Sequence, residues 1–123
     1  MDISIVIPLY NEDESLPELI AFFFWVVNSH NFSYEIVLVD DGSKDRSWEL
    51  IETNAKRNEH IHGIKFRRNY GKSAALHCGF QAAKGDVVIT MDADMQDSPD
   101  EIPALYDMIM KEDYDMVSGW KKK

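Results

Sequence analysis

Cysteine, basic residues and long apolar runs are scarce in this sequence, and each shortage excludes a class of protein. The single cysteine, Cys78, excludes an internal disulfide and is typical of a reducing compartment. The chain carries 13 Lys and Arg against 22 Asp and Glu, and this net charge of −9 argues against a nucleic-acid-binding protein. The longest apolar run, residues 19–27, is too short to span a membrane. Because the acid Asp2 stands where a signal peptide carries basic residues, we expect a cytoplasmic protein.

The composition that is present is ordinary for a folded domain. At 123 residues, with 45% hydrophobic and 28% charged residues, the chain is long enough to bury a core. The sequence shows no internal repeat, low-complexity tract or linker-like segment. We therefore expect a single domain over residues 1–123.

Short apolar runs alternate with segments of helical periodicity along the chain. Runs rich in Ile, Val and Leu predict strands at residues 4–9, 34–39, 61–66, 87–91 and 114–117. Apolar residues spaced three and four apart, with capping residues before them, predict helices at 16–27, from about 45 to 57, at 73–83 and at 99–109. This order predicts an α/β protein, a Rossmann-like three-layer α/β/α fold with a mostly parallel sheet.

Two details of this fold can be predicted from single residues. Within the apolar run at residues 4–9 we expect the strand itself to end at Pro8, because proline cannot donate a hydrogen bond to a neighbouring strand. We expect the fifth strand to be the last one, with the lysines at 121–123 forming a frayed tail or a cut point rather than a lipid-binding patch.

Two carboxylates and an amide follow the fourth predicted strand. In an extended chain Asp92, Asp94 and Gln96 point the same way, because residues two apart share a face. They would lie at the carboxyl edge of the sheet, where open α/β sheets bind ligands. Three oxygen donors favour Mg²⁺ or Mn²⁺ over zinc or copper. The alternative is an acidic loop without a ligand, since pairs of this kind are common by chance.

Polar clusters also follow other predicted strands. They are residues 8–12 (PLYNE) after the first strand, 40–43 (DDGS) after the second, and 69–72 (NYGK) after the third. Because the carboxyl ends of parallel strands meet at one edge, we expect these clusters to form a single site with residues 92–96.

Four motifs together resemble the family 2 glycosyltransferases of the GT-A fold, and within them the dolichol- or polyprenyl-phosphate sugar transferases. The motifs are 6–12 (VIPLYNE), 39–45 (VDDGSKD), 68–76 (RNYGKSAAL) and 91–97 (MDADMQD). They occur in the family's order and spacing, and the shared features run from residue 4 to residue 118. The resemblance is therefore more specific than any one motif.

The resemblance implies a role for each of these motifs. The residues that would contact a nucleotide-diphosphate sugar are Pro8, Tyr10, Asn11, Glu12, Asp40, Asp41, Arg68, Lys72, Asp92, Ala93 and Asp94. Asp40 or Asp41 would accept a hydrogen bond from the base, since a carboxylate suits an N–H donor. Asp94 and Gln96, together with Asp92, would hold the Mg²⁺ or Mn²⁺ that bridges the diphosphate.

The resemblance also implies a reaction and its partners. The donor would be a UDP- or GDP-linked sugar, the acceptor a polyprenyl or dolichyl phosphate, and the hexosyl transfer an inverting single displacement. The metal would stabilise the leaving nucleoside diphosphate as a Lewis acid. Chains of this family normally continue into an acceptor-binding part, so we expect a donor-binding part of low activity and assign no catalytic residue. We expect the full-length protein at the cytoplasmic face of a membrane, and oligomerisation stays open.

Two other classes remain as alternatives. A receiver-like signalling domain has this length and fold class, but it needs an acidic pair after the first strand, where Asn11 and Glu12 stand. A non-catalytic interaction module would use the aromatic residues at 22–25 as a docking surface.

Overall fold

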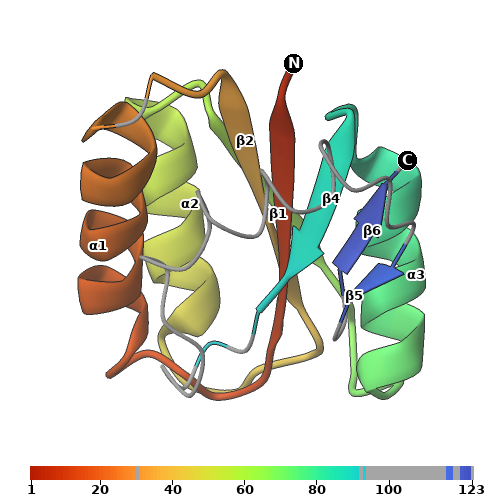
Figure 1. Cartoon of the computed structure of the whole chain (residues 1–123). Coiled ribbons are helices and arrows are strands. Elements are labelled where there is room, and N and C mark those ends of the chain that lie inside the picture. Colours follow the sequence, from red (N-terminus) through yellow and green to blue (C-terminus); the bar gives the residue numbers. More distant parts are fainter. Residues whose placement is uncertain (30, 92, 94–115, 118–119, 123) are drawn as a thin grey trace.

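A computed structural model of the chain describes residues 1–29, 31–91, 93, 116–117 and 120–122 (Figure 1). The predicted helix at 99–109 lies outside the described residues. The elements are, in chain order, β1 (Ile3–Leu9), α1 (Leu16–Ser29), β2 (Tyr34–Asp40), α2 (Ser47–Arg57), β3 (Ile61–Lys65), α3 (Lys72–Ala82), β4 (Val87–Thr90), β5 (Met116–Val117) and β6 (Trp120–Lys122).

The strands form one sheet in the order β3-β2-β1-β4-β6-β5. Strands β3, β2, β1 and β4 run parallel to one another. Parallel strands need a crossover connection, and α1 connects β1 to β2, α2 connects β2 to β3 and α3 connects β3 to β4. Helices α1 and α2 cover one face of the sheet and α3 covers the other (Figure 1). The predicted three-layer α/β/α fold with a mostly parallel sheet is therefore confirmed.

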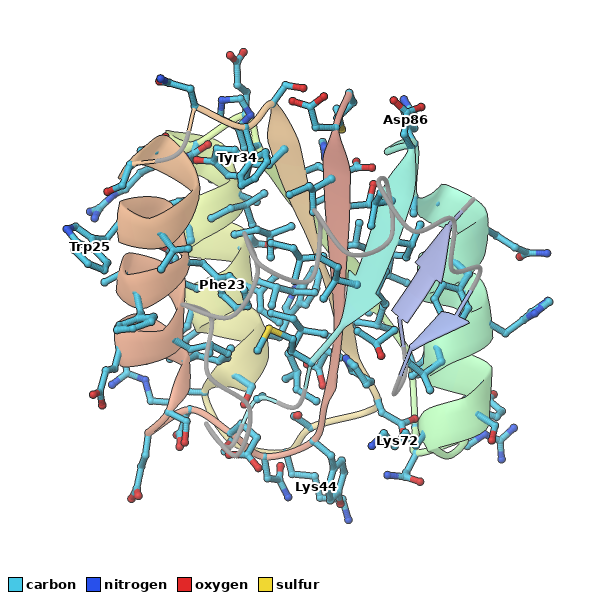
Figure 2. All side chains as sticks on the ribbon, in the orientation of Figure 1. Phe23, Trp25, Tyr34, Lys44, Lys72 and Asp86 are labelled. Carbon is cyan, nitrogen blue, oxygen red and sulfur yellow. The ribbon has the colours of Figure 1, made fainter. Side chains whose placement is uncertain are left out.

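Side-chain alternation along β1 and β2 divides the core into two layers. Every residue of these two strands is buried, as expected for central strands that are covered on both faces. Odd-numbered residues of β1 pack with α1 and α2, whereas Val6 packs in the cluster beneath α3. In Figure 2, Phe23 of α1 points toward the sheet and is fully buried, while Trp25 points away and is 65% exposed.

Pro8 ends the pairing of β1 on one side only, so the prediction that the strand stops there was wrong by one residue. The oxygen of Val6 accepts from Met91 N on the β4 side, whereas the oxygen of Leu9 accepts from Asp41 N on the β2 side. Hydrogen-bonding direction alternates along a strand, so the missing N–H of Pro8 belongs to the β4 side. Pairing with β2 therefore continues to Leu9, while pairing with β4 ends at Val6.

The C-terminal strands differ from the prediction that the fifth strand is the last one and is followed by a tail, because β6 lies between β4 and β5, while β5 runs in the same direction as β4. β5 pairs antiparallel with β6, and β6 pairs antiparallel with β4. Lys121 and Lys122, which we expected in a frayed tail, instead lie opposite Val88 and Val87. Two strands joined by only two residues, 118–119, have to pair antiparallel, because a parallel pair needs a long crossover.

Candidate functional site

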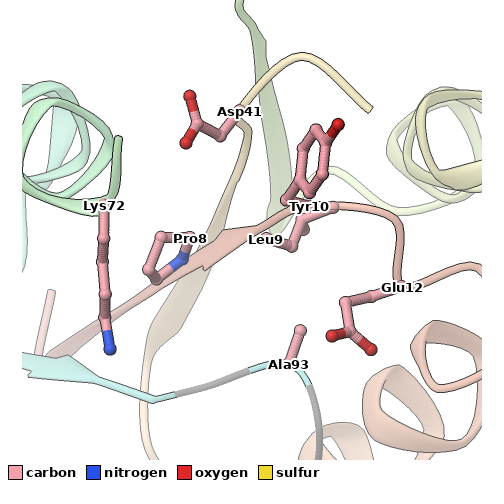
Figure 3. Close-up of a pocket in the computed structure, with 7 residues that line it drawn as sticks. All are labelled: Pro8, Leu9, Tyr10, Glu12, Asp41, Lys72 and Ala93. Carbon is pink, nitrogen blue, oxygen red and sulfur yellow. The ribbon is translucent and has the colours of Figure 1, made fainter. Parts of the chain in front are cut away.

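A pocket of about 330 Å³ opens at the carboxyl edge of the sheet (Figure 3). Its walls come from the ends of β1, β2 and β4 and from the start of α3. The lining residues are Pro8, Leu9, Tyr10, Glu12, Asp41, Lys72 and Ala93. The predicted convergence of several strand-end clusters at one edge is thus found in the structure, and all of these residues except Leu9 had been named from the sequence.

Pro8 contributes to the pocket because it ends the ladder between β1 and β4. Past Val6 and Thr90 the two strands are no longer paired, so the chain after β4 is free to diverge from β1. Ala93 lies in the pocket wall beyond this point, and its side chain is buried. Figure 3 shows Pro8 between Lys72 and Leu9.

Asp40 and Asp41 take different positions, although the sequence left either one as the base contact. Successive side chains of an extended segment point to opposite faces. Asp41 faces α3 and lines the pocket. Asp40 lies on the same face of β2 as Leu38, which packs toward α1 and α2, and it does not line the pocket. Asp40 is fully buried, and its Oδ1 accepts a hydrogen bond of 2.8 Å from Ser43 N. Within the described part of the chain, Asp40 Oδ2 is buried without a hydrogen-bond partner.

The carboxylate of Asp41 holds the loop that leads into α3. Its Oδ1 accepts from Tyr70 N at 2.7 Å and its Oδ2 accepts from Gly71 N at 3.1 Å. Hydrogen bonds to an ionised carboxylate are stronger than neutral ones, so this pair fixes the loop firmly. Lys72 is the first residue of α3 and follows directly, and its side chain runs past Pro8 (Figure 3).

Gly42 permits the loops after β2 and β3 to touch. Its φ is +80°, and a Cβ at this position would lie 2.3 Å from the carbonyl carbon of Arg68 and 2.6 Å from Asn69 N. The backbones therefore approach to a distance that only glycine allows. Together with the bonds of Asp41, this contact joins the second and third polar clusters.

A set of hydrogen bonds joins residues 11–13, after β1, to residues 43–47, after β2; we call this set the loop clamp. Its bonds are Asn11 N to Ser43 Oγ at 2.8 Å, Lys44 N to Asn11 Oδ1 at 2.8 Å, Glu12 N to Ser47 Oγ at 2.9 Å, Asp13 N to Asp45 Oδ2 at 3.2 Å and Arg46 N to Asp13 Oδ2 at 3.3 Å. The clamp sets the position of Tyr10 and Glu12 relative to Asp41.

The clamp also perturbs the titration of Asp45. Burial alone would raise the pKa of Asp45, but hydrogen bonds from Ser47 and Asp13 outweigh this effect and lower the pKa below its ordinary value. Asp45 Oδ1 accepts from Ser47 N at 2.9 Å, so the side chain bonds to the first residue of α2, although the N-cap position itself is Arg46, which makes no side-chain capping bond.

Asn11 and Arg68, which the resemblance assigns to contact with the nucleotide-diphosphate sugar, are not among the residues that line the pocket. The Oδ1 of Asn11 is engaged by Lys44 N in the loop clamp. Arg68 Nε donates to the hydroxyl of Tyr70 at 3.1 Å, and its guanidinium lies 5.3 Å above the ring of Tyr70. Asn11 is therefore bonded to the loop after β2, whereas Arg68 contacts Tyr70 within its own loop after β3.

The predicted metal ligands Asp92, Asp94 and Gln96 lie outside the described residues. Among the residues that are described, no three His, Cys, Asp or Glu side chains come together as a metal site. The described pocket itself carries two carboxylates, from Glu12 and Asp41, and one ammonium group, from Lys72.

The fold and the pocket define an α/β domain that presents a polar cavity at the carboxyl edge of a parallel sheet. The model of the family described as glycosyl transferase family 2 matches residues 4–123. The chain therefore belongs to glycosyl transferase family 2. This membership confirms the resemblance seen in the four motifs and favours a glycosyltransferase over a receiver-like domain.

Relatives within the family carry a narrower name. The chain is 44% identical over 121 residues to an undecaprenyl-phosphate 4-deoxy-4-formamido-L-arabinose transferase of Aeromonas hydrophila subsp. hydrophila, covering 98% of this chain and 37% of that protein. It is 48% identical over 117 residues to the protein of the same name from Pectobacterium atrosepticum, covering 94% and 36%. These are polyprenyl-phosphate sugar transferases, as the motifs predicted, and this chain spans little more than a third of their length.

Solved structures share the fold. The Pyrobaculum calidifontis mannosyltransferase PcManGT, in complex with GDP-Man and Mn²⁺, superimposes with a TM-score of 0.73 at 22% identity, over 86% of this chain and 32% of that one. The S. aureus TarS 1–349 complex with UDP gives a TM-score of 0.70 at 21% identity, over 94% and 34%. At this identity the likeness establishes the GT-A fold. No helix in the described part of the chain has the length and apolar character needed to cross a membrane.

Proposed function

We propose that this chain is the donor-binding part of a glycosyltransferase that moves a sugar unit from a nucleotide-diphosphate sugar to a polyprenyl phosphate. The observation that carries the proposal is the composition of the pocket wall. Ala93, the central residue of the 92–94 motif, lines the same cavity as Asp41 and Lys72 in a chain of glycosyl transferase family 2. The nucleotide end of a donor would lie by Asp41 and Tyr10, and its diphosphate by Lys72.

The charges of the described pocket fit a diphosphate only together with a cation. One ammonium group against two carboxylates leaves the cavity net negative, so an anionic ligand needs further positive charge. Asp94 and Gln96, with Asp92, would hold Mg²⁺ or Mn²⁺, whose ligands are typically oxygen atoms. When bound, such an ion supplies Lewis-acid stabilisation of the leaving diphosphate. The complex of PcManGT with GDP-Man and Mn²⁺ supports this choice of ion.

Asp41 is the better candidate for the base contact than Asp40. Both oxygens of Asp41 already accept a backbone N–H, but each retains a further lone pair for a donor on the base. Asp40 is buried away from the cavity and bonds to Ser43 N, which makes it a positioning group for the turn. The ring of Tyr10, 40% exposed, offers a surface on which a base could stack.

The acceptor would be a lipid phosphate, as the names of the relatives indicate for those proteins. A phosphate oxygen is already anionic at neutral pH, so an inverting displacement needs no general base to activate it. This is consistent with a chain in which we assign no catalytic base. We propose that the full-length protein works at the cytoplasmic face of a membrane and that this chain alone has low transferase activity.

A thermal-shift and calorimetric screen of UDP-, GDP- and dTDP-sugars, with Mn²⁺ or with EDTA, tests the proposal. A ligand at about ten times its dissociation constant adds about 1.4 kcal/mol to the free energy of unfolding, a shift of about 5 °C. We expect this shift for one nucleotide and only with Mn²⁺. Equal affinity in EDTA would refute the metal role, and no response to any nucleotide would refute the donor site.

Asp94→Ala is the variant that tests the metal ligand. We expect it to lose Mn²⁺-dependent nucleotide binding while keeping the thermal stability of the free protein. Asp86→Ala is a matched control, because it removes the same charge at the opposite end of the molecule from Lys72 (Figure 2). If Asp94→Ala binds as tightly as Asp86→Ala, Asp94 is part of an acidic loop without a ligand.

A further inference from the structure

Asn11 lies between two pocket-lining residues but does not line the pocket itself. Tyr10 and Glu12, its neighbours in the chain, both contribute to the wall. The backbone of Asn11 has a φ of +54°, in the left-handed region that Asn and Gly adopt more readily than other residues. The chain therefore bends sharply at this residue, and the bend carries the two flanking side chains to the cavity.

Two hydrogen bonds hold this bend against the loop after β2. Asn11 N donates to Ser43 Oγ and Asn11 Oδ1 accepts from Lys44 N, each at 2.8 Å. Ser43 N in turn donates to the buried carboxylate of Asp40, so Asn11 is tied to the end of β2 through a short chain of bonds. The bend at Asn11 is thus anchored to Asp40, the last residue of β2, which directly precedes Asp41.

We infer that Asn11 is a positioning residue whose Oδ1 holds Tyr10 and Glu12 in register with Asp41, and not a residue that contacts the nucleotide. The inference rests on the proposed function, because it assigns a role within the donor pocket. Only the acceptor half of the Asn11 amide is needed for this role. An aspartate at this position keeps an acceptor of the same shape and also tolerates the left-handed backbone.

Two variants separate positioning from direct contact. Asn11→Gly keeps the backbone conformation but loses the bond to Lys44 N, so we expect about 3- to 10-fold weaker binding of UDP or GDP with Mn²⁺. Asn11→Asp keeps the bond, so we expect affinity within about 2-fold of the wild type. If Asn11 instead donated to the nucleotide, Asn11→Asp would lose that donor and place a negative charge beside the diphosphate. Affinity of Asn11→Asp as low as that of Asn11→Gly, or unchanged affinity in Asn11→Gly, would overturn the inference.

The added charge of Asn11→Asp has a matched control in Asn28→Asp, an exposed position near the C-terminal end of α1. We expect Asn28→Asp to leave the nucleotide affinity unchanged. Circular dichroism of each variant confirms that it is folded before binding is compared.

The clamp has a second readout that needs no nucleotide. Hydrogen exchange of the Lys44 amide should be faster in Asn11→Gly than in the wild type and close to the wild type in Asn11→Asp. If the wild type binds no nucleotide, the donor site is wrong and this exchange pattern still decides the clamp. Equal exchange rates of the Lys44 amide in Asn11→Gly and the wild type would refute the positioning role of Asn11.

Discussion

Gly42→Ala should destabilise the protein more than any other glycine-to-alanine change in the loops of the pocket. The added Cβ would lie 2.3 Å from the carbonyl carbon of Arg68 and 2.7 Å from its Cα. These are backbone atoms, which cannot rotate aside as the end of a long side chain can. Relief therefore requires the loop after β3 to move away from the loop after β2.

The size of the effect has two parts. A non-glycine residue held in an unfavourable backbone region costs about 1–3 kcal/mol, and Gly42 has a φ of +80°. Overpacking adds about 1–3 kcal/mol where the neighbours cannot yield. The expected loss is about 2–6 kcal/mol, a large share of the roughly 5–15 kcal/mol that stabilises a domain.

Gly71→Ala is the matched control. Gly71 also has a positive φ, +100°, but a Cβ there would meet no atom within 4 Å. It therefore carries only the backbone part, about 1–3 kcal/mol. Because the backbone of Gly71, with a φ of +100° and a ψ of 159°, lies in a region essentially restricted to glycine, a larger loss in Gly42→Ala than in Gly71→Ala reports the close contact between the loops after β2 and β3.

Urea unfolding followed by tryptophan fluorescence gives the two free energies. We expect Gly42→Ala to be less stable than Gly71→Ala by at least about 1 kcal/mol. We also expect weaker nucleotide binding in Gly42→Ala, since Asp41 is the neighbouring residue. Equal losses in the two variants would show that the close contact is not formed in solution.

Two further predictions concern the carboxylates around the pocket. Asp41→Asn replaces one acceptor oxygen by a donor, so Tyr70 N or Gly71 N loses its partner and the free energy of unfolding should fall by about 1–3 kcal/mol in urea titrations; an unchanged midpoint would contradict the bidentate role of Asp41. The lowered pKa of Asp45 means that the folded state binds fewer protons than the unfolded state near the ordinary Asp pKa of about 3.9. The ionised Asp45 side chain therefore stabilises the fold above that pH, and this stabilisation is lost as the pH falls through the pKa of the folded state. Asp45→Asn should therefore flatten the acid side of a stability–pH curve below about pH 4, and an unchanged slope there would count against the clamp bonds of Asp45.

Much of the fold follows from local patterns in the sequence. The apolar spacing of α1 predicts which residues face the sheet, and Phe23 is buried accordingly. Polar clusters after the first three strands and Ala93 after β4 were expected at one edge, because parallel strands share their carboxyl ends. Six of the seven residues that line the pocket had been named individually, on the basis of the resemblance to family 2 glycosyltransferases.

Other features depend on contacts between distant parts of the chain. The clamp bonds join residues 32 to 35 positions apart, for example Asn11 with Ser43 and Glu12 with Ser47, and no local pattern indicates such pairs. The same applies to the hairpin of β5 and β6, whose pairing with β4 depends on an edge formed elsewhere in the sheet. A serine or an asparagine in a loop has many potential partners, and only the folded backbone selects one.

The two adjacent aspartates show where the division lies. The sequence alone determines that Asp40 and Asp41 end a buried strand and point to opposite faces, since alternation is a property of the extended backbone. Which face holds the pocket depends on where α3 packs. The packing of α3 also places Lys72, its first residue, and the two N–H groups that donate to Asp41. Helix packing is decided by long-range burial on both faces of the sheet, so only the tertiary structure assigns Asp41 to the cavity and Asp40 to the core.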